Sequence, residues 1–297
     1  MEGGERGALG RAYESRADGF GQERGNEMSS IAIRDMEPAD EYYVGTCTHT
    51  NESDEFDACA RRRLAWFRGM YDDGLRVKVA LYEGDRVAFL HVMPIEICPW
   101  GPLGRDLMAI PCLGVEEKVE RKGVGRALID AAEQEAKSQG KKGLVTVAYY
   151  WDFWLMPAPF FERCGFSIAR RRREPAGERF EAHEEAIMWR LLDASAEAPQ
   201  FLNRHYHFTP VPGVVVVDLF YSAFCVTGDI EAHRVREVVS EFGDAVMLRE
   251  YSADDRAILT RHQMPRGIFV NGKEMWWGHP APRDGIREAI ARALRGA

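Results

Sequence analysis

The sequence predicts an α/β protein of two units joined by a linker, and three observations support this prediction. Segments typical of strands and helices alternate across residues 29–193, whereas residues 194–212 contain three prolines and show little periodicity. A second alternating pattern, in the order β-α-β-α-β-β-α, occupies residues 213–297. The 297 residues are enough for each unit to bury a hydrophobic core of its own.

In the first unit, residues 55–71 carry apolar side chains at helical spacing, and Gly74 follows as a stop signal. Residues 77–94 read as two strands around the turn Glu83-Gly84-Asp85. The apolar run 106–115 predicts a strand buried on both faces, in which Pro111 indicates a bulge or an unpaired position.

The rest of the first unit continues the alternation. A helix is predicted from Arg126 to Gln139 and is closed by Gly140. A buried strand over 143–150, a short helix within 157–166 and a last strand over 184–192 follow it. The run Arg170 to Arg173 falls in a further strand, where we expect a solvated edge that discourages aggregation.

The second unit begins with a strand over 214–222 and a helix over 229–243. A strand over 245–252 and a helix over 253–263 come next. Residues 266–278 predict a hairpin that turns at Asn271-Gly272, and a helix over 283–296 closes the chain.

Charge and composition exclude several classes of partner. The net charge of −8 argues against nucleic acid and anionic membranes, because binding to either needs an excess of Lys and Arg. No apolar run approaches the ~20 residues of a membrane helix. Six scattered cysteines are typical of reduced thiols, so we expect a cytoplasmic protein, with a homodimer as an open alternative. Residues 1–28, rich in Gly, Arg and Glu, predict a disordered tail in which Met28 is an alternative start.

The loop Glu120-Arg121-Lys122-Gly123-Val124-Gly125 lies between a buried strand and a helix. A helix start leaves backbone N–H groups unpaired, and these donors together with the helix dipole form an anion site. The two glycines remove the Cβ atoms that would keep a pyrophosphate away from the backbone. The same glycines also suit a tight strand-to-helix turn, so the loop alone leaves both interpretations open.

The segments "LMAIPCLGVEEKVERKGVGRALIDAAEQEAKSQGKKGLVTVAYY" and "FFERCGF" resemble the GCN5-related N-acetyltransferase (GNAT) superfamily. In that family an Arg/Gln-x-x-Gly-x-Gly/Ala turn binds the pyrophosphate of acetyl-CoA. Glu120 stands here in place of the leading Arg or Gln. The resemblance implies a mixed-sheet GNAT fold over 29–193 and acetyl-CoA as cosubstrate. It implies contacts to the cofactor from Leu113, Val115, Arg121, Lys122, Gly123, Val124, Gly125, Arg126 and Phe161.

By the same resemblance, two splayed strands, around Leu113 to Val115 and Leu144 to Ala148, hold the pantetheine arm. The acetyl group then passes directly to a small-molecule or protein amine. An amine with a pKa near 10.4 is mostly protonated at neutral pH, and its neutral form costs about 4.6 kcal/mol unless a base takes the proton. We expect Glu96 to be that base, with His91 and Asp152 as the next candidates.

The departing thiolate benefits from a general acid, which in many GNAT enzymes is a tyrosine in the helix that contains "FFERCGF" here. The matching residue is Phe161, which has no proton to give. We therefore assign the acid to Tyr149, with Tyr150, water or a reaction without a general acid as alternatives. Cys112 lies in the central strand, where it either belongs to the core or lines the site as a further catalytic candidate.

Cys225 follows a strand and begins a helix, a position where the helix dipole lowers the pKa of a thiol. Pro265 precedes the hairpin, as the cis-proline does beside the active thiol of thioredoxin-like folds. Residues 213–297 thus resemble a thioredoxin-like domain. Gly228 replaces the second cysteine of Cys-x-x-Cys, so an internal disulfide is excluded. A monothiol function and a docking scaffold both remain open.

A GNAT domain followed by "APQFL" and a thioredoxin-like tail resembles the YoaP-like acetyltransferases. The predicted function is therefore N-acetyl transfer from acetyl-CoA to an amine. The alternatives are a non-catalytic CoA-binding regulator, and a protein that handles thiols or thiol-bound metals through Cys225. Cys47, His49 and Cys59 match no common metal-site spacing, so we expect no metal.

Overall fold

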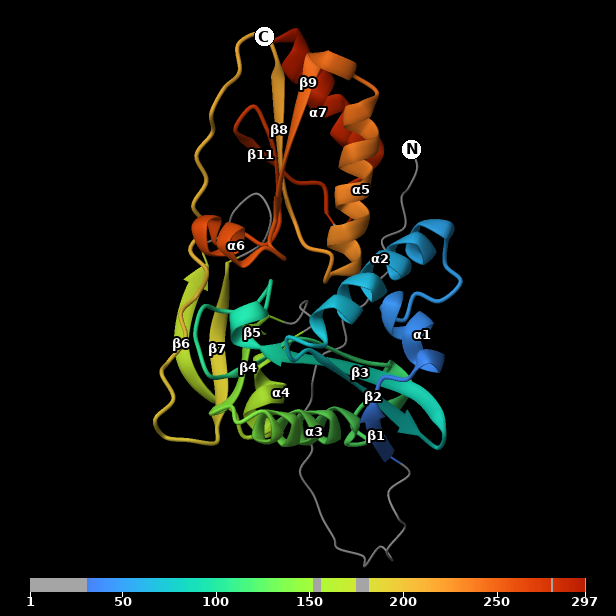
Figure 1. Cartoon of the computed structure of the whole chain (residues 1–297), viewed down its shortest axis with the longest axis vertical. Helices are drawn as coiled ribbons and strands as arrows, with labels where there is room; N and C mark the ends of the chain where they lie inside the picture. The colour runs from blue at the N-terminus through green and yellow to red at the C-terminus, as the bar shows by residue number, and fades with distance from the viewer. Residues whose placement is uncertain (1–30, 152–155, 175–181, 279, 297) are drawn as a thin grey trace, which may run out of the picture.

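The computed structural model describes residues 31–151, 156–174, 182–278 and 280–296 (Figure 1). The expectations for residues 1–28 and for Asp152 lie outside these ranges. The described chain forms two sheets, one within residues 31–192, called the first unit, and one within residues 214–296, called the second unit. Residues 193–213 connect them.

A seven-stranded mixed sheet forms the centre of the first unit, in the order β1-β2-β3-β4-β5-β7-β6. Only β4 and β5 run parallel, and every other neighbouring pair is antiparallel. The strands are β1 (Ile31–Asp35), β2 (Arg76–Tyr82), β3 (Asp85–Pro94), β4 (Met108–Val115), β5 (Gly143–Tyr150), β6 (Ser167–Glu174) and β7 (His183–Leu191).

Helices cover both faces of this sheet. The helices α1 (Glu41–Gly45) and α2 (Asp54–Met70) lie on the face toward the second unit, and α3 (Val124–Ser138) and α4 (Ala158–Arg163) lie on the opposite face (Figure 1). Each face has its own apolar core, because β2 to β5 are buried on both sides. The predicted helix over 55–71 and the predicted strand over 106–115 are thereby confirmed, with small shifts at their ends.

Pro111 produces the expected irregularity. The register between β3 and β4 shifts between His91 and Met93, opposite the Ile110-Pro111 stretch. A proline has no N–H to donate to the ladder, so a central strand accommodates it by a bulge.

The second unit has a four-stranded sheet in the order β11-β10-β8-β9. The pair β8 and β9 is parallel, and β10 is antiparallel to both β8 and β11. Its elements are β8 (Val215–Tyr221), α5 (Val226–Ser240), β9 (Val246–Ser252), α6 (Arg256–His262), β10 (Gly267–Val270), β11 (Lys273–Met275) and α7 (Arg283–Arg295). The predicted order of elements is confirmed. Asn271 and Gly272 turn the hairpin with φ of 46° and 80°.

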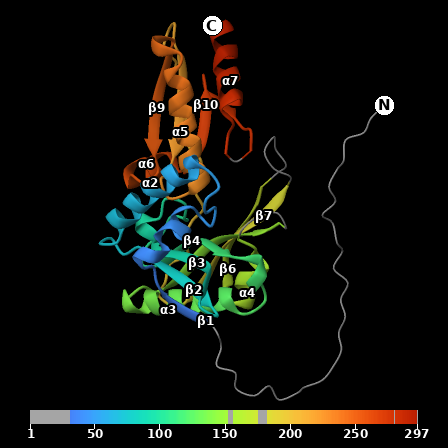
Figure 2. The same cartoon turned by 90° about the vertical axis from the view of Figure 1, so that its right-hand side faces the viewer.

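The two units meet where α2 crosses the start of α5, which Figure 2 shows from the side. Arg62 donates two hydrogen bonds from Nε to the carboxylate of Asp229, at 2.8 and 3.1 Å. The buried Arg63 donates to the carbonyl oxygens of Phe224, at 2.9 Å, and Val44, at 3.0 Å. Because most of these groups are buried, the interface holds the start of α5 in one position.

The linker is also held in place. Arg170 donates to the carbonyl of Pro199 at 2.6 Å, and Arg172 donates to the carbonyl of Leu202 at 2.9 Å. The guanidinium of Arg172 also lies over the ring of Phe201, 4.5 Å from its centre. The run thus lies on an exposed edge strand, as expected, and Arg170 and Arg172 additionally bind the linker.

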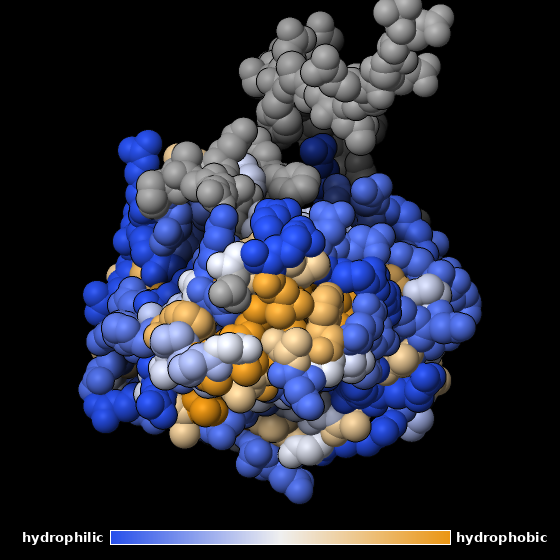
Figure 3. Space-filling view, turned by 90° about the horizontal axis from the view of Figure 1, so that it is seen from above, coloured by the Kyte–Doolittle hydropathy of each residue, from blue (hydrophilic) through white to orange (hydrophobic). Residues whose placement is uncertain are grey.

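One end of the molecule has a mainly polar surface (Figure 3). Looking down on the end of the second unit that points away from the first, Figure 3 shows one apolar patch near the middle of a polar surface. Among the described residues, no helix has the length and apolarity that a membrane span requires.

Candidate active site

The parallel strands β4 and β5 pair only at their beginnings. Met108 pairs with Leu144 and Ala109 with Val145, after which the two backbones separate. One side-chain bond crosses the gap beyond these pairs, from Thr146 Oγ1 to the carbonyl of Ile110 at 2.8 Å. Past this point β5 has its full ladder with β7 on its other side, so an opening lies between β4 and β5. Leu113 and Val115 lie in this separated part of β4, half-buried.

The start of α3 lies on the face of the sheet that points away from the second unit (Figure 1). The helix begins at Val124, two residues earlier than predicted, and Gly123 precedes it with a φ of 88°. No side chain caps the helix start. Arg121, which has a φ of 60°, and Lys122 are exposed beside it. The first N–H groups of a helix have no partner within the helix, so this start presents donors to an anion.

Gly125 has a further reason to be glycine. A Cβ built at this position would lie 3.0 Å from the ring of Phe160, a tight contact that the ring could accommodate only by shifting. The sequence attributes the missing Cβ to the approach of a ligand, whereas the structure adds a packing contact with α4. Phe160 was not singled out by its pattern, because an aromatic residue in a short helix carries no signal of its own.

Phe161, the residue at the position of the family's tyrosine, lies in the core. It is fully buried and packs edge-on against Phe160 and Phe166. The structure thus places Phe160, rather than Phe161, next to the start of α3. Of the other basic residues near this start, Arg126 donates to the carbonyl of Arg163, and Lys122 lies over the ring of Tyr82.

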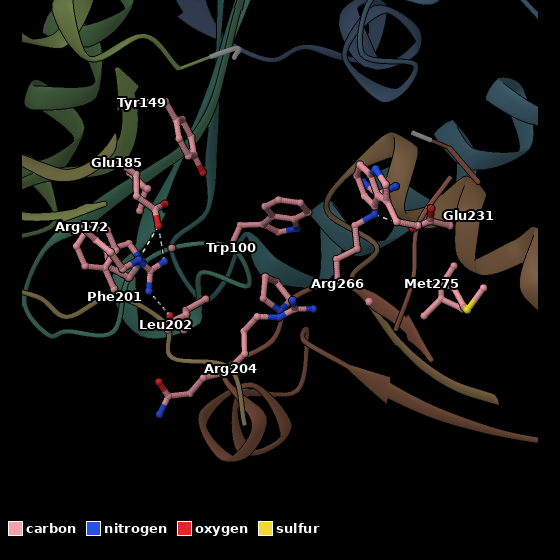
Figure 4. A pocket seen from close by; sticks show the side chains of 18 of the residues that line it. Trp100, Tyr149, Arg172, Glu185, Phe201, Leu202, Arg204, Glu231, Arg266 and Met275 are labelled. Carbon is pink, nitrogen blue, oxygen red and sulfur yellow. Dashed lines mark hydrogen bonds and ion pairs between the residues drawn. The ribbon is translucent and has the colours of Figure 1, made fainter. Parts of the chain in front are cut away.

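The two tyrosines at the end of β5 differ in their surroundings. The Tyr150 hydroxyl donates to Glu162 at 2.5 Å, and burial together with this bond raises its pKa to about 12. Its ring lies under Arg171 at the surface. Tyr149 lines a cavity between the two units and is the cross-strand partner of Glu185 on β7 (Figure 4).

The structure does not bring Glu96 to this region. Glu96 accepts a hydrogen bond from the N–H of Asp106 at 2.6 Å and lies 3.4 Å from Lys141. Asp106 and Lys141 precede β4 and β5, so Glu96 is at the ends where these strands begin. Tyr149 is at the end where β5 finishes. Distance along the strands therefore separates Glu96 from the proposed acid.

His91 is fully enclosed, and its ring lies near the rings of Phe67, Phe89 and Phe224. Neither ring nitrogen has a hydrogen-bond partner among the described residues. Burial lowers its pKa well below the usual value, so the imidazole is neutral. A side chain without solvent access cannot exchange a proton with an acceptor from solution.

Cys112 is the cross-strand neighbour of His91 and is half-buried on the face toward the second unit. Burial raises the pKa of its thiol, and the sulfur atoms of Cys47 and Cys225 act in the same direction. The thiol is therefore protonated at neutral pH, which makes it a weak nucleophile.

The cavity between the units has a volume of about 260 Å³. Its walls come from residues 100–102, β5, β6, β7, the linker and the segments around β10 and β11. Two ion pairs lie in its walls (Figure 4). Arg172 pairs with Glu185 on the first unit, and Arg266 pairs with Glu231 on the second. Burial raises the pKa of Glu185, against the opposing effect of Arg172.

Cys225 precedes α5, as predicted, and its Sγ lies 3.4 Å from Thr227 Oγ1. Arg266, the residue after Pro265, donates to the same Thr227 oxygen at 3.1 Å. The structure thus brings the segment of Pro265 close to the start of α5. A Cβ at Gly228 would lie 3.7 Å from that of Cys225.

Among the described residues, no group of three or more His, Cys, Asp or Glu side chains is arranged to hold a metal ion. His49 binds Glu52 through Nδ1 at 2.5 Å and stacks on Phe56. Cys59 is buried and donates to the carbonyl of Val226 at 3.5 Å, across the interface between the units.

Two sequence comparisons found similar proteins. Residues 73–168 match the family model described as Acetyltransferase (GNAT) domain. The chain is 26% identical over 152 residues to the uncharacterized N-acetyltransferase YoaP of Bacillus subtilis (strain 168). That match covers 50% of this chain and 56% of the relative, so it spans little more than half of the relative's length.

Solved structures similar to this chain align with just over half of it. The yncA protein of Salmonella typhimurium, determined with its cofactor acetyl-CoA, aligns with a TM-score of 0.43 and 19% identity over 57% of this chain and 98% of its own. The ribosomal-protein-alanine N-acetyltransferase of Brucella melitensis aligns with a TM-score of 0.40 and 20% identity, over 54% of this chain and 99% of its own.

Proposed function

We propose that the chain is an N-acetyltransferase that uses acetyl-CoA to acetylate an amine, because residues 73–168 match the model of the GNAT acetyltransferase domain. One observation carries this proposal: β4 and β5 separate after two residue pairs, directly beside an uncapped helix start. An opening between strands suits a long, thin arm, and the helix start suits the phosphates to which that arm is attached.

The residues around the opening fit the two parts of this cosubstrate. The N–H groups that follow Gly123 would bind the pyrophosphate, with Arg121 and Lys122 adding positive charge at the rim. Leu113 and Val115 on β4 would line the arm. The acetyl end would then reach the other face of the sheet, where Cys112 and the cavity between the units lie.

In the proposed reaction the amine nitrogen attacks the thioester carbonyl, so a C–N bond forms and the C–S bond breaks. The amine loses a proton, and the departing thiolate gains one. We assign the donor of that second proton to Tyr149, because it lines the cavity between the units. Tyr150 lies at the surface, where its hydroxyl donates to Glu162. We do not retain Glu96 as the base, since it lies where the strands begin.

The test is thioester consumption by the purified protein across a panel of amines, followed by the release of free thiol. We expect turnover with at least one amine, and we expect Tyr149→Phe to lower kcat about 100-fold or more, in the range of general acid catalysis. Tyr150→Phe is the matched control and should change kcat less than about threefold. Absence of turnover across the panel, or equal losses in the two variants, would contradict the proposal.

For the second unit we propose a thioredoxin-like fold used mainly for docking. The strand order β11-β10-β8-β9, with β8 parallel to β9 and Pro265 just before β10, supports the fold. Docking is supported by the buried contacts that the start of α5 makes with α2. All six cysteines are free, which supports a reducing compartment such as the cytoplasm as the place of action.

A further inference from the structure

We propose that the cavity between the two units binds the acceptor, and that the acceptor is a small amine that also carries a carboxylate. The amine part of this inference rests on the proposed function. The carboxylate part rests on the walls of the cavity itself. The second unit would then determine which amine is acetylated, by supplying the group that binds the carboxylate.

The cavity contains two buried donors without partners. Trp100 and Arg266 line it, and their atoms Nε1 and Nη2 are buried in its wall without a hydrogen-bond partner among the described residues. The other nitrogens of Arg266 are satisfied, with Nε donating to Glu231 at 2.7 Å and Nη1 to Thr227 at 3.1 Å. A buried donor left unpaired costs about 1–3 kcal/mol, which a ligand that brings an acceptor recovers.

The two carboxylates Glu231 and Glu185 in the cavity wall already accept hydrogen bonds from protein groups. Glu231 accepts from Arg266 and from the N–H of Ala281 at 3.1 Å, and Glu185 accepts from Arg172 at 2.6 Å. The open hydrogen-bonding positions are therefore donors, and one of them belongs to a guanidinium. A guanidinium and an indole N–H together match the planar, negatively charged oxygens of a carboxylate.

Size and lining favour a single small molecule over a protein segment. The volume of about 260 Å³ is close to the lower end of the range for small-molecule pockets. The aromatic side chains among the lining residues are Trp100, Tyr149, Phe201, Trp276 and Trp277. These rings suit the apolar part of an amino acid.

The position of the donors sets the orientation. In Figure 4, Tyr149 and Glu185 lie on the side of the first unit and Arg266 on the side of the second, with Trp100 between them. A carboxylate held by Arg266 and Trp100 leaves the rest of the molecule to extend toward Tyr149. The amine would then lie on the side where β5 borders the opening that receives the acetyl group.

The experiment measures kcat/KM for the common α-amino acids and for the matched amines that lack the carboxylate, such as L-phenylalanine against 2-phenylethylamine. We expect the preferred amino acid to exceed its matched amine by at least about tenfold, because an unpaired buried donor penalises the amine. In parallel, calorimetric titration of that amino acid into the CoA-saturated protein reports binding without turnover.

Two variants locate the effect. Arg266→Lys keeps the charge beside Glu231 but removes the free Nη2 donor, and Trp100→Phe removes the indole donor while keeping an aromatic ring. We expect each to reduce the ratio of kcat/KM for the amino acid to kcat/KM for its matched amine about three- to tenfold. Arg287→Lys is the control, because Arg287 pairs with Glu241 on the surface of the second unit.

The outcomes separate this inference from the proposed function. Turnover of amines without any preference for a carboxylate overturns the inference and leaves the function standing. Binding of an amino acid that depends on Arg266, without thioester consumption, supports the cavity assignment and overturns the acetyl transfer. Absence of amino-acid binding together with absence of turnover for every amine, with or without a carboxylate, overturns both.

Discussion

Two helices of this protein begin in the same way and have opposite surroundings. Both α3 and α5 follow a strand, and neither has a side-chain cap at its start. At α3 the residues Glu120 to Gly123 are exposed to solvent. At α5 the corresponding residues are packed against the first unit, where Val226 and Ile230 contact Cys59.

This difference shows that a helix start becomes a binding site only if the rest of the fold leaves it open. At α3 the neighbouring strands separate and the donors face solvent. At α5 the carbonyl of Phe224, two residues before the helix, accepts a hydrogen bond from Arg63, and Asp229 in the first turn accepts one from Arg62. The start of α5 therefore joins the two units, although it carries a cysteine in the position of a reactive thiol.

We expect the largest loss of stability from a substitution of Arg63, because this residue holds the start of α5 against the first unit. Arg63→Met leaves the carbonyls of Phe224, Val44 and Gly45 without their buried donor, and we expect a loss of about 3 kcal/mol or more in the free energy of unfolding. Arg61, two residues earlier and exposed, provides the control Arg61→Met, which should change stability by less than about 0.5 kcal/mol. Urea unfolding measures both, and equal losses would contradict the assigned role.

A smaller, pH-dependent effect is expected at the same interface. Glu55 on α2 accepts from Arg234 at 2.8 Å and from Arg283 at 3.0 Å, and the hydrogen bond from Arg234 is the main cause of its lowered pKa. A lowered pKa in the folded state stabilises the protein above the unfolded value of about 4.3, and this stability is lost as pH falls through the folded value.

Glu55→Gln should therefore cost about 1 kcal/mol at pH 7, and the difference from the wild type should shrink toward zero as the pH falls below about 4. Urea titrations at pH 7 and pH 3.5 check this expectation. A difference that is constant with pH would show that the pair does not act through the charge of Glu55.

We expect the smallest effect on stability from a substitution of Gly228. This substitution tests how closely the start of α5 resembles that of a thioredoxin-like helix. The Cβ-to-Cβ distance of 3.7 Å from Cys225 lies within the range of disulfides, so Gly228→Cys should form an internal disulfide under mild oxidation. Peptide mapping by mass spectrometry detects it, with Gly228→Ser as the control. Disulfide-linked dimers without the internal bond would contradict the geometry.

The strands and helices could be predicted because their signals are local. Each signal determines the structure of only a few consecutive residues. Examples are the apolar periodicity of α2, the apolar run of β4 and the Asn271-Gly272 turn. The start of α3 was recognisable for the same reason, since its loop, strand and helix are consecutive.

The cavity could not be predicted, because its walls come from segments far apart in the sequence. Trp100 and Arg266 carry no shared periodicity, and only the docking of the two units brings them to one cavity. Similarly, three consecutive arginines at 61–63 look alike in the sequence, although one is exposed, one pairs with Asp229 and one is buried. Long-range packing alone decides such differences.

The central claim is that the open start of α3 binds the phosphates of acetyl-CoA, and calorimetric titration of acetyl-CoA tests it most directly. We predict binding of one molecule per chain, weakened about tenfold by Arg121→Glu, which places a negative charge beside the helix start, and changed less than about twofold by Arg295→Glu at the far end of the second unit. Absence of binding to the wild type, or equal weakening by the two charge reversals, would contradict the claim.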